Sequence, residues 1–236
     1  MENIKMIVSD YDQTFYINDE DIEVNKIYVN KFMNLGNLFV IATGRSYLDF
    51  HNKLNAYNFN YDYAILNHGT TIIDKNDNVL FNVEISNEVI LQIQNDLNLN
   101  ECLNYFCCSV YNNVSFEHKN LTKIHVKYNS KEYALNKANY INNKYGNYVK
   151  AYYVSTNSVE IISNKTNKAL AIYWLIKFYN NINKDNVYVI GDSYSDIEMV
   201  KEFKGYCMKD SVSELKSIAN KEYSSVSSLI KEILSL

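Results

Sequence analysis

Three short apolar segments of this chain each end abruptly in a polar cluster, and this pattern constrains the fold more than any other feature. The segments read VSDYDQT, IATGR and VIGDSYSD, at residues 8–14, 41–45 and 189–196. Continuous apolar runs of this length are typical of strands that are buried on both faces, as in a parallel sheet. Because the carboxyl ends of parallel strands line one crevice, the three polar clusters are expected to meet there.

Strand and helix patterns alternate at both ends of the chain. Residues 25–35 are predicted to form a helix with Ile27, Phe32 and Leu35 apolar. Residues 168–179 form a predicted helix that is apolar nearly all round and is therefore expected to be buried. Further strands are predicted at 4–9, 38–43, 63–66, 187–190 and 205–208, and further helices at 46–55, 195–204, 212–220 and 226–235.

The alternation stops between residues 83 and 158. Two amphipathic helices, 87–98 and 131–145, occur there among strand-like stretches. The sequence therefore predicts an α/β fold with a Rossmann-like parallel sheet core and helices on both faces, formed by residues 1–82 and 159–236. An α+β domain is inserted at 83–158.

Composition and charge argue against several kinds of partner. The chain has 236 residues, of which 47% are hydrophobic, so it can bury a sizeable core. Its 23 Lys and Arg against 27 Asp and Glu give a net charge of −4, whereas proteins that grip a nucleic-acid backbone are usually basic. No apolar run reaches the ~18 residues that span a bilayer, and the N-terminus does not resemble a signal peptide. We expect a cytoplasmic monomer or homodimer with no nucleic-acid or membrane partner.

The polar clusters are rich in carboxylates. Asp10, Asp12, Asp192 and Asp196 would repel one another in a shared crevice unless a cation neutralised them. Hard oxygen ligands with no nearby His or Cys favour Mg²⁺ over zinc. With Thr43 as a hydroxyl donor and a lysine, such a site suits phosphoryl transfer, in which a carboxylate attacks phosphorus.

The four cysteines leave one other metal site conceivable. Cys102, Cys107, His118 and His125 could hold zinc, but no paired CxxC or HxxxH spacing supports it. Buried, reduced thiols are the favoured interpretation.

The polar clusters resemble the motifs of the haloacid dehalogenase-like phosphatases. DYDQT is similar to their first motif, DxDxT; IATGR to the second, an apolar strand ending in Thr or Ser; and GDSYSDIEM to the fourth, GDxxxD. The third motif, a lysine at the head of a helix, is met by Lys168 rather than Lys165, because an apolar helix starts directly behind Lys168. The motifs occur in the family's order, and the insert resembles the α/β cap of its Cof-like branch, class IIB.

The resemblance implies roles for the matching residues. Asp10 would be the nucleophile and Asp12 the general acid and base, while Thr43 would hydrogen-bond the phosphoryl oxygens and Lys168 would offset negative charge. The metal ligands would be Asp10, Asp12 through its main-chain carbonyl, Asp192, and Asp196, which supports the metal's water shell or Lys168. Further candidates for phosphate binding are Gly44, Arg45, Asn67 and Ser195.

Three positions depart from the family's pattern. Gln13 stands where Gly is usual, Ser195 replaces a common Asn, and NHGT inserts His68 where NGA is usual. None of the three removes a catalytic group. They bear on the rate and the fit of the substrate rather than on the class of reaction.

The expected activity is Mg²⁺-dependent hydrolysis of a small phosphorylated metabolite, a sugar phosphate by resemblance, through an aspartyl-phosphate. A phosphomutase or another phosphotransferase on the same core is the nearest alternative. It needs a cationic cluster in the cap, which Lys119, Lys123 and Lys127 could supply, although charges at this spacing usually form a solvated face. A non-catalytic protein that binds a phosphometabolite is a further alternative.

Overall fold

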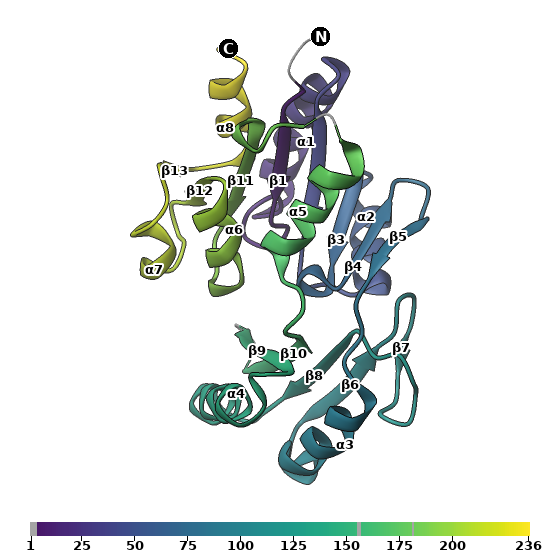
Figure 1. The fold of residues 1–236 in the computed structure, drawn as a ribbon. Helices are drawn as coiled ribbons and strands as arrows, with labels where there is room; N and C mark the ends of the chain where they lie inside the picture. Colours follow the sequence, from purple (N-terminus) through teal and green to yellow (C-terminus); the bar gives the residue numbers. More distant parts are fainter. Residues whose placement is uncertain (1–3, 155–156, 181) are drawn as a thin grey trace.

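Two β-sheets organise the chain (Figure 1). The computed structural model describes residues 4–154, 157–180 and 182–236, so residues 1–3 of the predicted core and 155–156 of the predicted insert lie outside the described part. Within it, the larger sheet has eight strands in the order β13 (Glu222–Tyr223), β12 (Lys204–Met208), β11 (Val187–Gly191), β1 (Met6–Ser9), β2 (Leu38–Ala42), β3 (Tyr63–Leu66), β4 (Thr71–Asp74) and β5 (Val79–Asn82).

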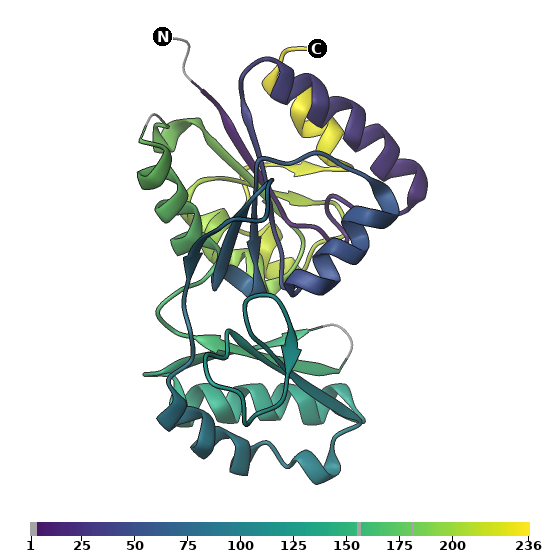
Figure 2. The ribbon, with the colours of Figure 1, turned by 90° about the vertical axis from the view of Figure 1, so that its right-hand side faces the viewer.

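The strands from β13 to β3 are parallel, and β4 and β5 extend the sheet as antiparallel strands. Every residue of β1 and β2 is buried, because helices pack on both faces of the sheet (Figure 2). One face carries α1 (Asp19–Asn34), α2 (Tyr47–Tyr57) and α8 (Val226–Ile233), and the other carries α5 (Lys168–Tyr179), α6 (Ile197–Glu202) and α7 (Ser213–Lys216). This confirms the predicted Rossmann-like core.

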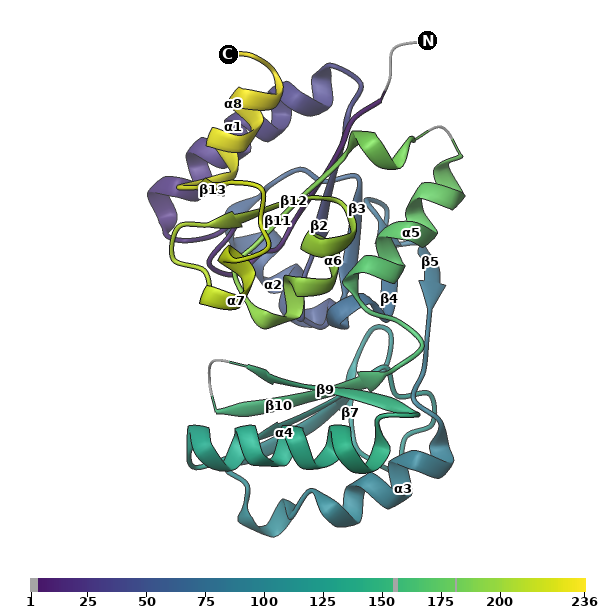
Figure 3. The ribbon, with the colours of Figure 1, turned by 60° about the vertical axis from the view of Figure 1, so that its left-hand side comes forward.

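The smaller sheet belongs to the inserted segment, called the cap below. Its strands are antiparallel and lie in the order β7 (Asn113–Val114), β6 (Asn104–Cys108), β8 (Lys123–Lys127), β10 (Ser158–Ser163) and β9 (Val149–Val154). Helices α3 (Asn87–Asp96) and α4 (Lys131–Tyr145) cover the face that points away from the core, so the opposite face of the sheet looks toward the core (Figure 3).

Both connections between core and cap rest on the loop after β3. The Val83 amide donates to the Thr70 carbonyl at 2.8 Å, and the Thr166 hydroxyl donates to the Gly69 carbonyl at 2.8 Å. Strand β10 runs on to Ser163. The predicted end of the insert at 158 therefore falls at the first residue of a strand that pairs with β8 and β9.

Helix α1 differs from its prediction in both start and register. It begins at Asp19, and the Asn18 side chain caps it by accepting from the Glu20 and Asp21 amides. Its buried apolar face consists of Ile22, Val29 and Phe32. Ile27 and Leu35, the other apolar residues of the predicted helix, lie outside this face and are 54% and 61% exposed. The predicted helix over residues 25–35 leaves out the acidic first turn, Asp19, Glu20 and Asp21, with which α1 begins.

Helix α5 matches its predicted bounds but is not buried all round. Leu170 and Phe178 are 46% and 51% exposed, because only one face packs on the sheet. Two predicted C-terminal helices are shorter than expected, and the two-residue strand β13 was not predicted. Within the described residues, no helix has the length and apolar character that crossing a membrane would require.

Candidate active site

The registers of three adjacent strands bring the predicted motifs to one level. Ser9 of β1 is paired with Ile41 of β2 on one side and Ile190 of β11 on the other. The chain therefore leaves the sheet at neighbouring points after each strand. The Asp10 amide still donates to the Ile190 carbonyl at 2.9 Å, which fixes the start of the first loop.

The loop after β1 is anchored by its apolar residues. Tyr11 and Phe15 are fully buried, and the Phe15 amide donates to the Asp10 carbonyl at 3.1 Å. Gln13 has a φ of 58°, a left-handed conformation that Gly adopts without steric cost. The departure noted at Gln13 thus leaves the loop in a conformation that favours Gly.

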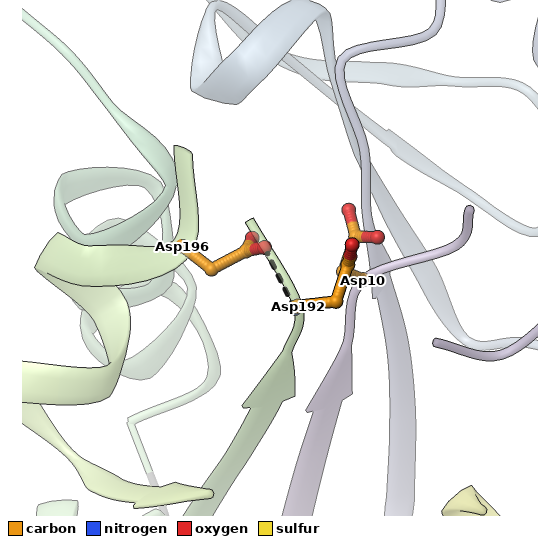
Figure 4. Close-up of side chains that lie close together, drawn as sticks. All are labelled: Asp10, Asp192 and Asp196. Carbon is orange, nitrogen blue, oxygen red and sulfur yellow. Dashed lines mark hydrogen bonds between the residues drawn. The ribbon is translucent and has the colours of Figure 1, made fainter. Parts of the chain in front are cut away.

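Three carboxylates lie together at the ends of β1 and β11 (Figure 4). Asp10, Asp192 and Asp196 each offer an oxygen within 4.8 Å of the others. Burial raises the pKa of Asp10 well above its usual range; Lys168 opposes the shift, whereas Asp196 and Asp192 add to it. Burial and then the charge of Asp196 raise the pKa of Asp192 to about 7. A cation at this cluster would reverse both shifts.

Asp196 is the most fully bonded of the three carboxylates. One oxygen accepts from Lys168 at 2.7 Å, and the other accepts from the amides of Asp192 and Ser193 at 3.1 and 3.0 Å and from the Ser193 hydroxyl at 2.9 Å. A Cβ on Gly191 would overlap this carboxylate, so only Gly fits there. Both oxygens have donors already, which suits a supporting role better than direct metal ligation.

Lys168 joins two of the carboxylates from the first turn of α5. Its ammonium group lies 2.6 Å from Asp10 and 2.7 Å from Asp196, and the side chain is 1% exposed. Burial acts to lower the pKa of Lys168, but Asp10 and then Asp196 raise it above its usual value. Lys165, the other candidate, is exposed in the connection before α5.

Asp12 lies apart from this cluster and is held by Arg45. The guanidinium makes two hydrogen bonds, Nε to Oδ2 at 2.8 Å and Nη2 to Oδ1 at 2.7 Å. Burial acts to lower the pKa of Arg45, but the bond and charge of Asp12 raise it. The Asp12 side chain is 48% exposed, so it remains accessible to solvent. The fork geometry fixes the orientation of its carboxylate.

Thr43 and Gly44 form a turn at the end of β2. Thr43 is buried, its amide donates to the Ile65 carbonyl at 2.8 Å, and its hydroxyl oxygen accepts from the Arg45 amide at 3.1 Å. The Thr43 hydroxyl oxygen accepts this bond, so its hydrogen remains available to donate to a ligand.

Asn67 and Ser195, which are predicted to bind phosphate, form hydrogen bonds with other residues. Asn67 is buried, and its side-chain Nδ2 donates to the Thr122 hydroxyl of the cap at 3.3 Å. The Ser195 hydroxyl lies 3.1 Å from that of Ser193. Thr14, the Thr of DxDxT, has a role that the motif alone did not indicate, because its hydroxyl donates to Asp192 at 3.2 Å.

Neither the zinc site nor the solvated lysine face that the sequence suggested for the cap is found as expected in the part of the chain that the structure describes. Among the described residues, the only group of three or more potential metal-ligating His, Cys, Asp or Glu is the cluster of aspartates, so the Cys and His residues of the zinc alternative do not form one. Lys123 is 1% exposed, so the expectation of a solvated face is wrong for this residue. It belongs to strand β8, where alternate residues share a face, and not to a helix.

Comparison with known families agrees with this geometry. The sequence pattern of the haloacid dehalogenase-like hydrolases matches residues 7–144 and 106–228. The chain belongs to this family. A protein of Buchnera aphidicola subsp. Baizongia pistaciae, provisionally named a phosphatase, is 25% identical over 269 residues, and the alignment covers 97% of each chain. The family and this relative support the predicted class of enzyme, a phosphatase.

Solved structures of other proteins share the fold of both the core and the cap of this chain. A HAD/COF-like hydrolase from Plasmodium vivax is 19% identical with a TM-score of 0.83, over 99% of this chain and 96% of that one. A haloacid dehalogenase-like hydrolase from B. subtilis is 16% identical with a TM-score of 0.82, over 98% and 100% of the two chains. The Cof-like arrangement of core and insert expected from the sequence is therefore found in this fold.

Proposed function

We propose that the chain is a Mg²⁺-dependent phosphatase that hydrolyses a small phosphorylated metabolite, such as a sugar phosphate, through an aspartyl-phosphate on Asp10. The observation that carries this proposal is the buried Lys168 ammonium between Asp10 and Asp196, with Asp192 beside them. Burying a lysine and several carboxylates costs free energy of folding. Such buried, titratable groups are concentrated at functional sites, where they meet a charged ligand.

The donor set fits a hard divalent cation. Asp10 and Asp192 supply carboxylate oxygens, and the main-chain carbonyl of Asp12 is a further candidate. Thr14 orients Asp192, and Asp196 holds the amides of Asp192 and Ser193. When bound, Mg²⁺ would neutralise the carboxylates and offset charge on the phosphoryl oxygens.

The residues of the chain divide the reaction between them. An Asp10 oxygen attacks phosphorus, the leaving oxygen departs on the opposite side, and the phosphoryl group is carried on Asp10. The Thr43 hydroxyl and Lys168 donate to the equatorial oxygens, where negative charge is spread. Asp12 acts as the acid at the leaving oxygen once a proton has replaced one of its hydrogen bonds to Arg45, and it then acts as the base that takes a proton from the water that releases phosphate from Asp10. Arg45 keeps the Asp12 carboxylate in one orientation.

Two of the three cap lysines considered for a phosphomutase do not form a free cationic cluster. Lys123 bonds to Glu160 at 2.9 Å and to the Gly44 carbonyl at 2.5 Å, so its charge is already matched. Lys119 is exposed in a loop of the cap. Lys119 and Lys123 therefore give no argument for an enzyme that must bind a bisphosphate, and we propose the phosphatase.

A panel of phosphorylated metabolites, scored for released phosphate, tests the proposal. We expect turnover with Mg²⁺, loss of turnover in excess chelator and recovery when Mg²⁺ is restored. Asp10→Asn is the matched control for contaminating phosphatase. Release of phosphate at an equal rate by wild type and Asp10→Asn, or full activity in excess chelator, would contradict it.

A further inference from the structure

A row of polar and aromatic side chains crosses the face of the cap sheet that looks toward the core. The strand registers place His125 of β8, Glu160 of β10 and Tyr152 of β9 side by side. Alternate residues of a strand share a face, so Lys123 lies on the same side as His125. The intervening Ile124 and Ile161 pack with the helices on the other face. A carboxylate thus stands in the middle of the surface that meets the core.

Glu160 is the centre of a buried charge cluster. Its carboxylate bonds to Lys123 at 2.9 Å, to Nδ1 of His125 at 3.0 Å and to Nε2 of His68 at 2.5 Å. Burial acts to raise the pKa of Glu160, but Lys123 and then the two histidines hold it well below its usual range. Two of these partners belong to the cap, and His68 belongs to the core.

The core presents His68 to this cluster from an uncommon backbone conformation. His68 has a φ of 58°, in the left-handed region that side chains with a Cβ rarely occupy. Its ring stacks on Tyr152 of the cap, with centroids 4.8 Å apart and planes at 26°. Residues held in such conformations are concentrated at functional sites. The ring is also so close to Gly44 that a Cβ at position 44 would overlap it.

Two partners of Glu160, Lys123 and His68, also form hydrogen bonds with the peptide groups that follow Thr43. The Lys123 ammonium donates to the Gly44 carbonyl at 2.5 Å, and the other end of that peptide group, the Arg45 amide, donates to the Thr43 hydroxyl oxygen at 3.1 Å. The His68 amide donates to the Thr43 carbonyl at 3.0 Å. The two peptide groups that follow Thr43 are therefore held by residues that Glu160 contacts.

We propose that Glu160 is a positioning residue, through which the cap orders the turn at Thr43–Arg45 and orients the Thr43 hydroxyl for phosphate binding. The path runs from Glu160 to Lys123, across the Gly44–Arg45 peptide group, to the Thr43 hydroxyl oxygen, with His68 fixing the opposite side of the turn. The inference rests on the proposed function only in assigning Thr43 to phosphate. Glu160 itself touches none of the reacting atoms.

The first experiment measures binding of inorganic phosphate with Mg²⁺ by calorimetry in wild type and Glu160→Gln. Gln keeps the size of the side chain but removes the charge that fixes Lys123. We expect the dissociation constant for phosphate, and KM for an aryl phosphate, to rise about tenfold or more, with a smaller change in kcat, since a hydrogen bond to a charged group governs the order of the turn. Values within twofold of wild type for a folded variant would overturn the proposal.

A second variant separates positioning from loss of stability, since Glu160→Gln leaves Lys123 buried without its counter-charge. In Glu160→Gln with Lys123→Met both charges are gone, so we expect recovery of thermal stability but no recovery of phosphate affinity. Recovery of both would show that Glu160 only stabilises the cap. Lys144→Met is the matched control, because it removes a cap ion pair, to Asp96, that has no contact with the turn.

Hydrogen–deuterium exchange gives a readout that needs no turnover. We expect faster exchange in peptides that contain residues 43–46 in Glu160→Gln and in the double variant, and no change there in Lys144→Met. If wild type proves inactive as a phosphatase but the exchange changes as described, the positioning role stands and the proposed function fails. Unchanged exchange at 43–46 would overturn the role of Glu160 whatever the activity.

Discussion

Lys168 donates a hydrogen bond to Asp10 at 2.6 Å, although the two residues lie 158 positions apart in the chain. The fold makes this contact possible, because Asp10 follows the last residue of β1 and Lys168 is the first residue of α5, which packs on the same sheet. The ammonium is enclosed on both sides, by Asp10 and by Asp196. The pair therefore links the two segments of the core, before and after the cap, at the candidate active site.

The first prediction concerns Lys168→Met. Removing the ammonium leaves Asp10, Asp192 and Asp196 without their buried counter-charge. We expect a loss of about 3–5 kcal/mol in the free energy of unfolding, measured by urea denaturation, and a fall in kcat of at least ~100-fold on an aryl phosphate. The neighbouring exposed lysine gives the control: Lys165→Met should change neither quantity appreciably. Equal effects of the two substitutions would count against the assignment of Lys168.

How far the sequence predicts this site can be seen from Lys168 and Asp12. Placement after buried strands predicts that Asp10, Asp192 and Asp196 meet, because a parallel sheet aligns the ends of its strands. Lys168 is identified instead through the order of the family's motifs and the apolar helix that follows it. The partner of Asp12 was not predictable in this way. Its bond to Arg45 depends on the path of a loop with a left-handed residue, Gln13, which no periodic pattern encodes.

The cap shows the same limit for a different reason. Its strands and helices were visible as patterns, but a lone Glu160 in β10 carries no signal of its partners. His68, Lys123 and His125 come from separate strands and loops, and only the pairing register brings them to one carboxylate. The spacing of Lys119, Lys123 and Lys127 is typical of a solvated face. Lys123 lies instead in a strand, in the stretch where the sequence indicates one, and this strand has one face turned toward the core.

The second prediction concerns the pH dependence of stability and follows from the pKa of about 7 for Asp192. Without a cation, the native state keeps a proton that the unfolded chain releases near pH 4, so this group makes the metal-free protein less stable as pH rises from about 4 to about 7. In chelator at pH 7.5, Asp192→Asn should therefore raise the free energy of unfolding by about 1 kcal/mol or more.

With Mg²⁺ bound, wild type should become more stable than Asp192→Asn. The cation binds the ionised carboxylates, so it should raise the melting temperature of wild type more at pH 7.5 than at pH 5.5, and should have little effect on Asp192→Asn. Thermal melts at the two pH values, with chelator and with Mg²⁺, check both statements. A melting temperature of Asp192→Asn below that of wild type in chelator would refute the predicted sign.

The third prediction concerns removal of the cap. The hydrophobic cluster of the cap is confined to residues between Ile85 and Ile161, while the two clusters of the core contain none of them. Both connections return to adjacent residues, Gly69 and Thr70. Replacing residues 84–164 by a short Gly–Ser linker should therefore leave a core that unfolds cooperatively.

The shortened protein should lose selectivity among phosphorylated substrates if the cap acts as a lid. Relative rates across a substrate panel, compared with those of the full chain, measure this loss. We expect the spread of rates to narrow and KM to rise for every substrate, because the Thr43–Arg45 turn also loses its contact with Lys123. An unchanged order and spread of rates would show that the cap does not select substrates.

The last prediction separates the two carboxylates of the first loop. Asp10 is buried beside Lys168, whereas Asp12 is half exposed and held by Arg45, and the proposed mechanism gives them unequal tasks. Asp10→Asn should abolish turnover and any covalent phosphoryl group on the chain. Asp12→Asn should slow turnover by about 10²–10⁴-fold, the usual contribution of a general acid and base.

With an aryl phosphate the leaving group departs without much protonation, so Asp12→Asn should still complete the first step. The second step lacks its base, and phosphate should therefore accumulate on Asp10. Rapid quench followed by mass spectrometry of the peptide that contains Asp10 detects the added group. If the phosphate is found on another residue, or if Asp10→Asn retains turnover close to that of wild type, Asp10 is not the nucleophile, and the crevice at the ends of β1 and β11 needs a different mechanism.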